Sequence, residues 1–157
     1  MDPRDYYRRE AEGFVKGSVD ADLTALYAPF FAALPEGARI LDAGCGSGRD
    51  SSIFAELGYA VSAFDASPEM VQLARDYTGM LVECRRFDDV DEVAVYDGIW
   101  ACASLLHVPE GDLPGVLQRL ERALKPGGTL YASFKEGDGS RVDAEGRHFT
   151  DLRSEQL

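Results

Sequence analysis

Apolar residues in the first part of the chain recur at helical spacing. Within residues 6–15, Tyr7 and Phe14 fall on one face of a helix, which predicts an N-terminal helix. Residues 22–34 (DLTALYAPFFAAL) indicate a second helix, in which Pro29 would favour a kink. We therefore expect helical structure at the N-terminus, before the pattern changes.

Short continuous apolar runs then alternate with amphipathic stretches. Each run is bounded by glycine or polar residues, which is typical of a buried strand. Alternating strands and helices imply right-handed crossovers and a parallel sheet, so we expect the α/β class with a doubly wound, mostly parallel sheet. The expected strands are 38–44, 59–65, 80–87, 96–103 and 129–134, and the expected helices between them are 49–58, 67–79 and 112–128.

The length of 157 residues favours one domain spanning 1–157. We divide it into an N-terminal helical cap, 1–35, and a core, 36–135. The tail, 136–157, is polar, and we expect a loop there, followed by the first turns of a helix at TDLRSEQL.

Composition and charge exclude several kinds of partner. The net charge of −12 disfavours nucleic acid and anionic membrane surfaces, because both bind basic proteins. No run of eighteen apolar residues is present, and the first residues lack the apolar stretch of a signal peptide, so we expect a cytoplasmic protein. Three cysteines, Cys45, Cys84 and Cys102, are read as free thiols, and with only two histidines we expect no metal site.

A glycine-rich loop follows the first expected strand in ILDAGCGSGRD. Gly44, Gly46 and Gly48 lead into a helix, as in loops that bind nucleotides. A dinucleotide loop has the pattern G-x-G-x-x-G, and its third glycine would fall at Arg49 here. The spacing therefore favours a ligand that lies close to the backbone without being a pyrophosphate.

Two acids add charge to this loop. Asp42, at the end of the first strand, would repel a pyrophosphate but attract an ammonium or sulfonium group. The helix N-terminus after the loop would bind a carboxylate. Asp65 ends the second strand, where an acid typically accepts hydrogen bonds from ribose. S-adenosylmethionine carries all these groups, and Phe87 and Met70 could pack against its adenine.

Five motifs, in order, resemble class I S-adenosylmethionine-dependent methyltransferases. They are ILDAGCGSGRD, AFDASPEM, FDD, YDGIWACASLLHVP and ALKPGGTLYASF, and the resemblance covers about residues 6–135. The runs GCGSGRDS and GYAVSAFD are most similar to small-molecule methyltransferases, including relatives of tellurite-resistance enzymes.

The resemblance implies a Rossmann-like methyltransferase fold that binds S-adenosylmethionine and releases S-adenosylhomocysteine. It places Asp65 at the ribose and Asp88 near the adenine, with the backbone at Gly44 and at 101–102 near the methionine part. With the residues argued above, the expected cofactor-binding set is Tyr7, Asp42, Gly44, Cys45, Gly46, Arg49, Asp65, Ala66, Met70, Phe87, Asp88, Ala101 and Cys102.

Methyl transfer is an in-line displacement, so alignment of the acceptor is the main task of the protein. His107, in SLLHVP after the fourth strand, is the candidate general base, or else a structural histidine of the loop. Arg49 either reaches the ligand's carboxylate or pairs with Asp50. Tyr7 either caps the site or packs with Phe14 along the N-terminal helix. Trp100, in mid-strand, is expected in the core.

The chain also departs from the family pattern. Seven strands are usual in the family, whereas five are visible here, and the chain ends where the next crossover helix would begin. Either the domain is shortened, or something else covers the fifth strand, whose open edge could support self-association. A small-molecule acceptor is expected, with no nucleic acid or membrane as partner. The alternatives are a non-catalytic cofactor-binding domain that needs a partner chain and, less well matched, an NAD-dependent oxidoreductase.

Overall fold

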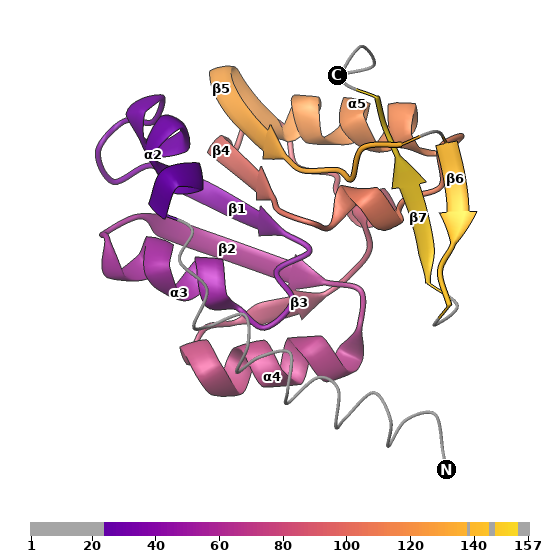
Figure 1. The fold of residues 1–157 in the computed structure, drawn as a ribbon. Coiled ribbons are helices and arrows are strands. Elements are labelled where there is room, and N and C mark those ends of the chain that lie inside the picture. Colours follow the sequence, from indigo (N-terminus) through magenta and orange to yellow (C-terminus); the bar gives the residue numbers. More distant parts are fainter. Residues whose placement is uncertain (1–23, 138, 145–146, 154–157) are drawn as a thin grey trace.

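A parallel sheet of five strands forms the centre of the protein (Figure 1). The structure is a computed structural model, and it describes residues 24–137, 139–144 and 147–153. The strand order is β3-β2-β1-β4-β5, and every neighbouring pair is parallel. The expected fold class is therefore confirmed. The strands are β1 (Arg39–Ala43), β2 (Ala60–Asp65), β3 (Val82–Cys84), β4 (Tyr96–Ala101) and β5 (Leu124–Ala132).

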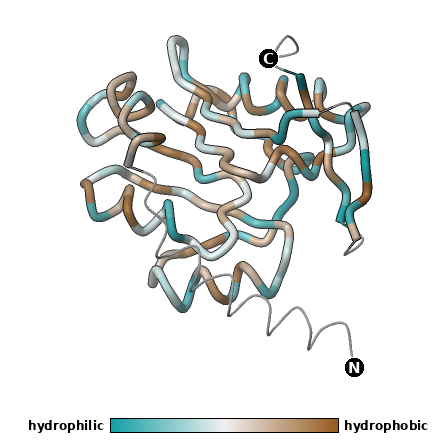
Figure 2. The backbone as a smooth tube through the Cα atoms, in the orientation of Figure 1, coloured by the Kyte–Doolittle hydropathy of each residue, from teal (hydrophilic) through white to brown (hydrophobic). Residues whose placement is uncertain are grey.

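Helices cover both faces of this sheet. Ile40 and Leu41 are neighbours on β1, so their side chains point to opposite faces. Ile40 packs with Phe54 of α3 on one face, and Leu41 belongs to the cluster that contains Leu120 of α5 on the other. Figure 2 shows the hydrophobic residues gathered along the inner strands. The helices are α2 (Thr24–Ala32), α3 (Arg49–Glu56), α4 (Pro68–Thr78) and α5 (Leu113–Ala123), with the 3-10 turns η1 (Phe87–Asp89) and η2 (Leu105–His107).

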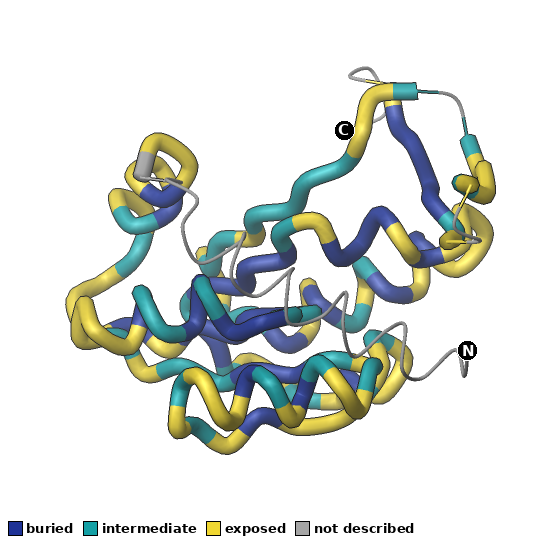
Figure 3. Tube along the Cα trace, turned by 60° about the horizontal axis from the view of Figure 1, so that its bottom comes forward, coloured by how far each residue is buried: buried dark blue, intermediate teal, exposed yellow. Residues whose placement is uncertain are grey.

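The bounds of α4 follow from local sequence chemistry. Ser67 caps the helix, because its hydroxyl accepts a hydrogen bond from the backbone N–H of Met70 at 3.3 Å. Pro68 takes the first helical position, where its missing N–H costs nothing. Gly79 ends the helix with a φ of 70°, a conformation that glycine adopts freely. Figure 3 shows buried and exposed residues alternating along the helices at the sheet surface.

An aromatic cluster attaches α2 to the sheet. Trp100 of β4 is fully buried, as expected, and its ring lies 5.3 Å from that of Tyr27 and 5.0 Å from that of Phe30, measured between centroids. Tyr131 of β5 stacks on Trp100 at 3.9 Å. The helix expected at 22–34 is thus present as α2, whereas the helix expected at 6–15 lies outside the described residues.

The helix expected over 112–128 ends earlier than its pattern indicated. α5 stops at Ala123, and β5 already begins at Leu124. The sequence placed the end of this helix at Pro126 and Gly127, but proline also disfavours the helical conformation of the residue before it, so the helix ends ahead of Pro126.

The expectation of a loop in the tail is wrong, and residues 150–153, where a helix was expected to start, are not helical, while 154–157 lie outside the described residues. The strands β6 (Gly139–Val142) and β7 (His148–Asp151) form an antiparallel hairpin that is a separate two-stranded sheet. Phe149 is 3% exposed and Leu152 is 9% exposed, so burial of these side chains favours the hairpin over an open loop.

The outer side of β5 pairs with no other strand in the described part of the chain, since β6 and β7 pair only with each other. Leu130 on this strand is 37% exposed. Among the described helices, none is long and apolar enough to cross a bilayer.

Candidate functional site

A cavity of about 660 Å³ opens at the carboxyl ends of the parallel strands. Its walls come from the loop after β1, the end of β2, η1, and the segment that follows β4. The strand order reverses between β1 and β4, and open α/β sheets bind their ligands at such a switch point. The volume lies in the range of small-molecule sites.

The glycine loop reaches this cavity through close backbone packing. Gly44 has a φ of 75°, and a Cβ placed on it would lie 2.4 Å from the Cβ of Ser104. The backbone N–H groups of Gly44 and Cys45 both donate to the carbonyl of Phe64, at 3.0 and 2.9 Å. Ser104 in turn donates its hydroxyl to the carbonyl of Ala43 at 2.7 Å. Glycine is therefore required at position 44, both for its φ and for the space.

Asp65 is held in place at the end of β2. One of its carboxylate oxygens accepts from the backbone N–H of Gly46 at 2.9 Å, and the other accepts from that of Ser67 at 3.0 Å. Asp65 also lines the cavity. Because a carboxylate has about four acceptor positions, it can still accept hydrogen bonds from a pair of hydroxyl groups.

An apolar wall stands beside this acid. Phe64 and Phe87 meet edge to face with ring centroids 5.4 Å apart, and both line the cavity together with Met70 and Val116. Asp88 follows Phe87 in η1 and also lines the cavity. This wall offers apolar contact to a flat ring, with an acceptor at its edge.

The structure does not bring Asp42 to the cavity. Its side chain is buried, and its carboxylate accepts a hydrogen bond from the hydroxyl of Ser51 at 2.6 Å. Burial, and then the negative charge of Asp50, raise the pKa of Asp42 to about 7. The expectation of direct contact with a bound cation is therefore corrected. Ala101 is also buried and does not line the cavity, because its side chain packs in the cluster beneath α5.

Asp50 is the acid that lies at the cavity wall instead. It accepts from the indole N–H of Trp100 at 2.9 Å and from the hydroxyl of Tyr27. Arg49 donates to both carboxylate oxygens, at 3.0 and 3.1 Å, so the pairing of Arg49 with Asp50 is present, while Arg49 itself also lines the cavity. Burial and the bond to Asp50 raise the pKa of Tyr27, which remains a hydrogen-bond donor.

His107, in η2, also lines the cavity. Its Nδ1 is 2.8 Å from the backbone carbonyl of His148, and its ring centroid is 4.7 Å from that of Phe149. Cys45 lines the cavity too, but burial raises the pKa of its thiol, so it does not present a thiolate.

Most of the expected site residues do meet at this cavity. Tyr7 lies outside the described residues, and Asp42 and Ala101 are buried and do not line the cavity. Within the described chain, no group of three or more His, Cys, Asp and Glu side chains is arranged to hold a metal. The expected residues that line the cavity are Gly44, Cys45, Gly46, Arg49, Asp65, Ala66, Met70, Phe87, Asp88, Cys102 and His107.

Sequence reasoning took Cys102 and His107 of the segment between β4 and α5 into the expected site but left out other lining residues of this segment. Ala103, Ser104, Pro109 and Asp112 all line the cavity. The motif SLLHVP pointed to this segment but only His107 was selected from it. Ala103 has a φ of 50°, which is uncommon for a residue with a Cβ, and no sequence pattern marks it.

Comparison with known sequences identifies methyltransferases as relatives of this chain. A family model described as methyltransferase domain matches residues 14–156. The ubiquinone biosynthesis O-methyltransferase of Xanthomonas axonopodis pv. citri is 37% identical over 107 residues, which cover 63% of this chain and 44% of that protein. The chain therefore spans less than half the length of this relative.

Solved structures resemble all or most of the chain. The 1,6-didemethyltoxoflavin-N1-methyltransferase of Burkholderia thailandensis, solved with 1,6-didemethyltoxoflavin and S-adenosylhomocysteine bound, aligns with a TM-score of 0.67 and 25% identity, over 100% of this chain and 76% of that one. An S-adenosylmethionine-dependent methyltransferase from Methanosarcina mazei aligns with a TM-score of 0.74 and 22% identity, over 83% and 80% of the two chains.

Proposed function

This chain belongs to the methyltransferase domain family, and on that premise we propose that it transfers a methyl group from S-adenosylmethionine to a small-molecule acceptor. The observation that carries the proposal is the cavity at the switch point, bounded by the glycine loop and Asp65. The names of the relatives support a small acceptor, since they include enzymes of ubiquinone biosynthesis and of 1,6-didemethyltoxoflavin methylation.

The residues at the cavity fit the adenosine part of the cofactor. Asp65 would accept hydrogen bonds from the ribose hydroxyls, because it is fixed by two backbone N–H groups and retains free acceptor positions. Phe87 and Met70 would contact the adenine ring, and Asp88 would accept from its amino group. The backbone at Gly44 would lie against the ligand, since Gly44 lines the cavity.

The amino-acid part of the cofactor would lie toward α3. Arg49 is at the first position of this helix and lines the cavity, so its guanidinium group and the N-terminal end of the helix would bind a carboxylate. The carboxyl group of Asp50, which lines the cavity, would lie beside the ammonium and sulfonium groups. Asp42 would not contact these groups, because burial and its hydrogen bond with Ser51 keep its side chain away from the cavity.

When bound, S-adenosylmethionine supplies a methyl group that is already electrophilic, so the chain's own residues need only align the acceptor and remove its proton. Alignment of this kind can lower a barrier by about 7–11 kcal/mol. We assign the general base to His107, which lines the cavity. A well-placed base contributes roughly 10²–10⁴-fold.

The whole of 1–157 would act as one domain in this proposal. The net charge of −12 disfavours nucleic acid as a partner, which also favours a small acceptor. The glycine spacing and the acids near the loop disfavour a nicotinamide dinucleotide.

Isothermal titration calorimetry and a methyl-transfer assay together test the proposal. S-adenosylhomocysteine should bind one site on the full chain, NAD should not bind, and radiolabelled methyl groups should move to members of a metabolite library. Binding of S-adenosylhomocysteine without any transfer would point to a non-catalytic domain that needs a partner chain. Binding of NAD alone would refute the proposal.

A further inference from the structure

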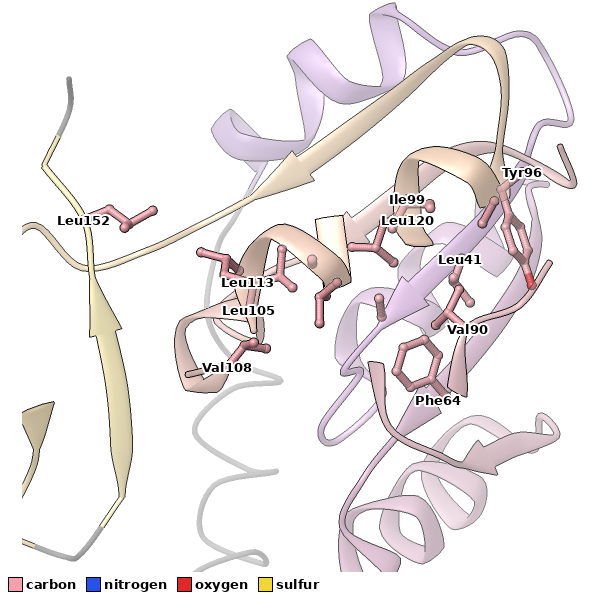
Figure 4. Packing of buried hydrophobic residues seen from close by; sticks show 14 residues of the cluster. Leu41, Phe64, Val90, Tyr96, Ile99, Leu105, Val108, Leu113, Leu120 and Leu152 are labelled. Atoms are coloured by element: carbon pink, nitrogen blue, oxygen red, sulfur yellow. The ribbon is translucent and has the colours of Figure 1, made fainter. Parts of the chain in front are cut away.

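The C-terminal end of the β6–β7 hairpin is attached to the rest of the chain near His107. The backbone N–H of Leu152 donates to the carbonyl of Lys135 at 3.0 Å, and that of Gly137 donates to the carbonyl of Leu152 at 3.2 Å. The side chain of Leu152 joins the core cluster that contains Leu105 and Val108 (Figure 4). The chain that leaves β5 therefore returns to the segment that carries His107.

A buried hydroxyl group on β7 makes a second attachment, to the segment that carries His107. Thr150 is fully buried, and its Oγ1 donates to the backbone carbonyl of Val108 at 2.5 Å. The same Oγ1 lies 3.4 Å from Nε2 of His148. Since the hydroxyl's one proton is used on Val108, Nε2 of His148 is the donor in this second contact. Val108, the residue that follows His107, is thus hydrogen-bonded directly to β7.

The ring of His107 meets β7 in two ways. Phe149 packs against it with ring centroids 4.7 Å apart. The backbone carbonyl of His148 lies 2.8 Å from its Nδ1. A carbonyl can only accept a hydrogen bond, so Nδ1 must carry a proton. In a neutral imidazole with a proton on Nδ1, Nε2 is left as the acceptor.

We propose that the hairpin is a positioning element, which holds the neutral ring of His107 in the tautomer with the proton on Nδ1 and leaves Nε2 as an acceptor at the cavity. The catalytic consequence rests on the proposed function. Nε2 takes the proton from an acceptor O–H or N–H, while the acceptor atom forms its bond to the methyl carbon. The carbon–sulfur bond breaks, its electron pair stays on sulfur, and the carbonyl of His148 stabilises the imidazolium that results.

Nuclear magnetic resonance tests the tautomer without any enzymatic activity. The chain has only two histidines, so long-range ¹H–¹⁵N spectra of the uniformly labelled full chain contain two rings, and H148Q identifies which is which. At a pH where titration of the same spectra shows both rings neutral, His107 should show a protonated Nδ1 and an unprotonated Nε2. A proton on Nε2, or an even mixture of both tautomers, would overturn the proposal.

A matched pair of variants tests the role of the hairpin. Thr150→Val removes the hydroxyl that holds Val108 and keeps the side-chain shape. Ser140→Ala removes a hydroxyl from the exposed residue that pairs with Thr150 across the hairpin. Thr150→Val should mix the tautomers of His107 and lower kcat about tenfold with little change in KM, whereas Ser140→Ala should change neither.

Acceptors of graded acidity separate positioning from loss of structure. With substituted phenols as acceptors, Thr150→Val should lose most activity on phenols that are protonated at the assay pH and little on those already ionised. Equal losses on both would mean a purely structural effect and would refute the positioning role. If the wild-type protein methylates none of these phenols but shows the expected tautomer, the failure belongs to the proposed substrate class, and the orientation of His107 stands.

Discussion

Substitution of Gly44 by alanine tests whether the glycine loop packs as closely as the structure shows. Two costs add at this position. The φ of 75° places an alanine in the left-handed region, which costs roughly 1–2 kcal/mol. The new Cβ would also lie 2.4 Å from the Cβ of Ser104, whose hydroxyl is bound to the carbonyl of Ala43. Such overpacking typically costs about 1–3 kcal/mol.

Gly37→Ala is the matched control for Gly44→Ala. Gly37 has a φ of 67°, similar to that of Gly44, but nothing lies within 4 Å of a Cβ placed there. Urea unfolding should therefore show a loss of roughly 1–2 kcal/mol for Gly37→Ala and of about 2–5 kcal/mol for Gly44→Ala. Calorimetry should show weaker binding of S-adenosylhomocysteine only for Gly44→Ala. Equal losses of stability in both variants, with equal affinity, would refute the close approach of the loop to Ser104.

The remaining predictions concern three side chains. Asp65→Asn should leave the fold intact but weaken binding of S-adenosylhomocysteine about tenfold or more, since hydrogen bonds to a charged group contribute about 1.5–3 kcal/mol; unchanged affinity in calorimetry would remove Asp65 from the ribose site. His107→Ala should lower kcat by roughly 10²–10⁴-fold and leave the affinity for S-adenosylhomocysteine nearly unchanged; an unaltered kcat would make His107 structural. Burial raises the pKa of Asp42 to about 7, whereas the ordinary value is about 3.9. The folded state therefore binds the proton more tightly, and this group's contribution to stability falls as the pH rises from about 4 to 7. Asp42→Asn should gain stability relative to the wild type over that window in urea unfolding, and a constant difference would contradict the raised pKa.

Local chemistry made much of the fold predictable from sequence. Ser67, Pro68 and Gly79 bound α4 through contacts within a few residues, so their effect is visible in the sequence itself. The acid at the end of β2, Asp65, was also found, because a strand followed by a turn and a helix N-terminus fixes where its side chain emerges. For Asp65, its position at a strand end was enough to predict that it lines the cavity.

Position at a strand end did not predict the place of Asp42 correctly, because the side chains of a strand point to two opposite faces of the sheet. Asp42 follows Ile40 and points to the same face, where α3 supplies Ser51 as its partner. Both faces of β1 are buried, so apolar alternation does not show which side chains reach the cavity. Only the packing of α3 against the sheet decides whether the side chain of Asp42 reaches the cavity.

The tail was misjudged for a related reason. Its strands are only four residues each, and their burial depends on contacts with residues far away in sequence. Thr150 is buried because it meets Val108, and Leu152 because it meets the cluster under α5. Local propensity contains none of this information.

A crystal structure of the full chain with S-adenosylhomocysteine tests the central claim most directly. The account predicts the ribose hydroxyls within hydrogen-bond distance of Asp65, the adenine against Phe87, and the carboxylate near Arg49. A ligand bound elsewhere, or a cavity that stays closed to the ligand at saturating concentration, would contradict it.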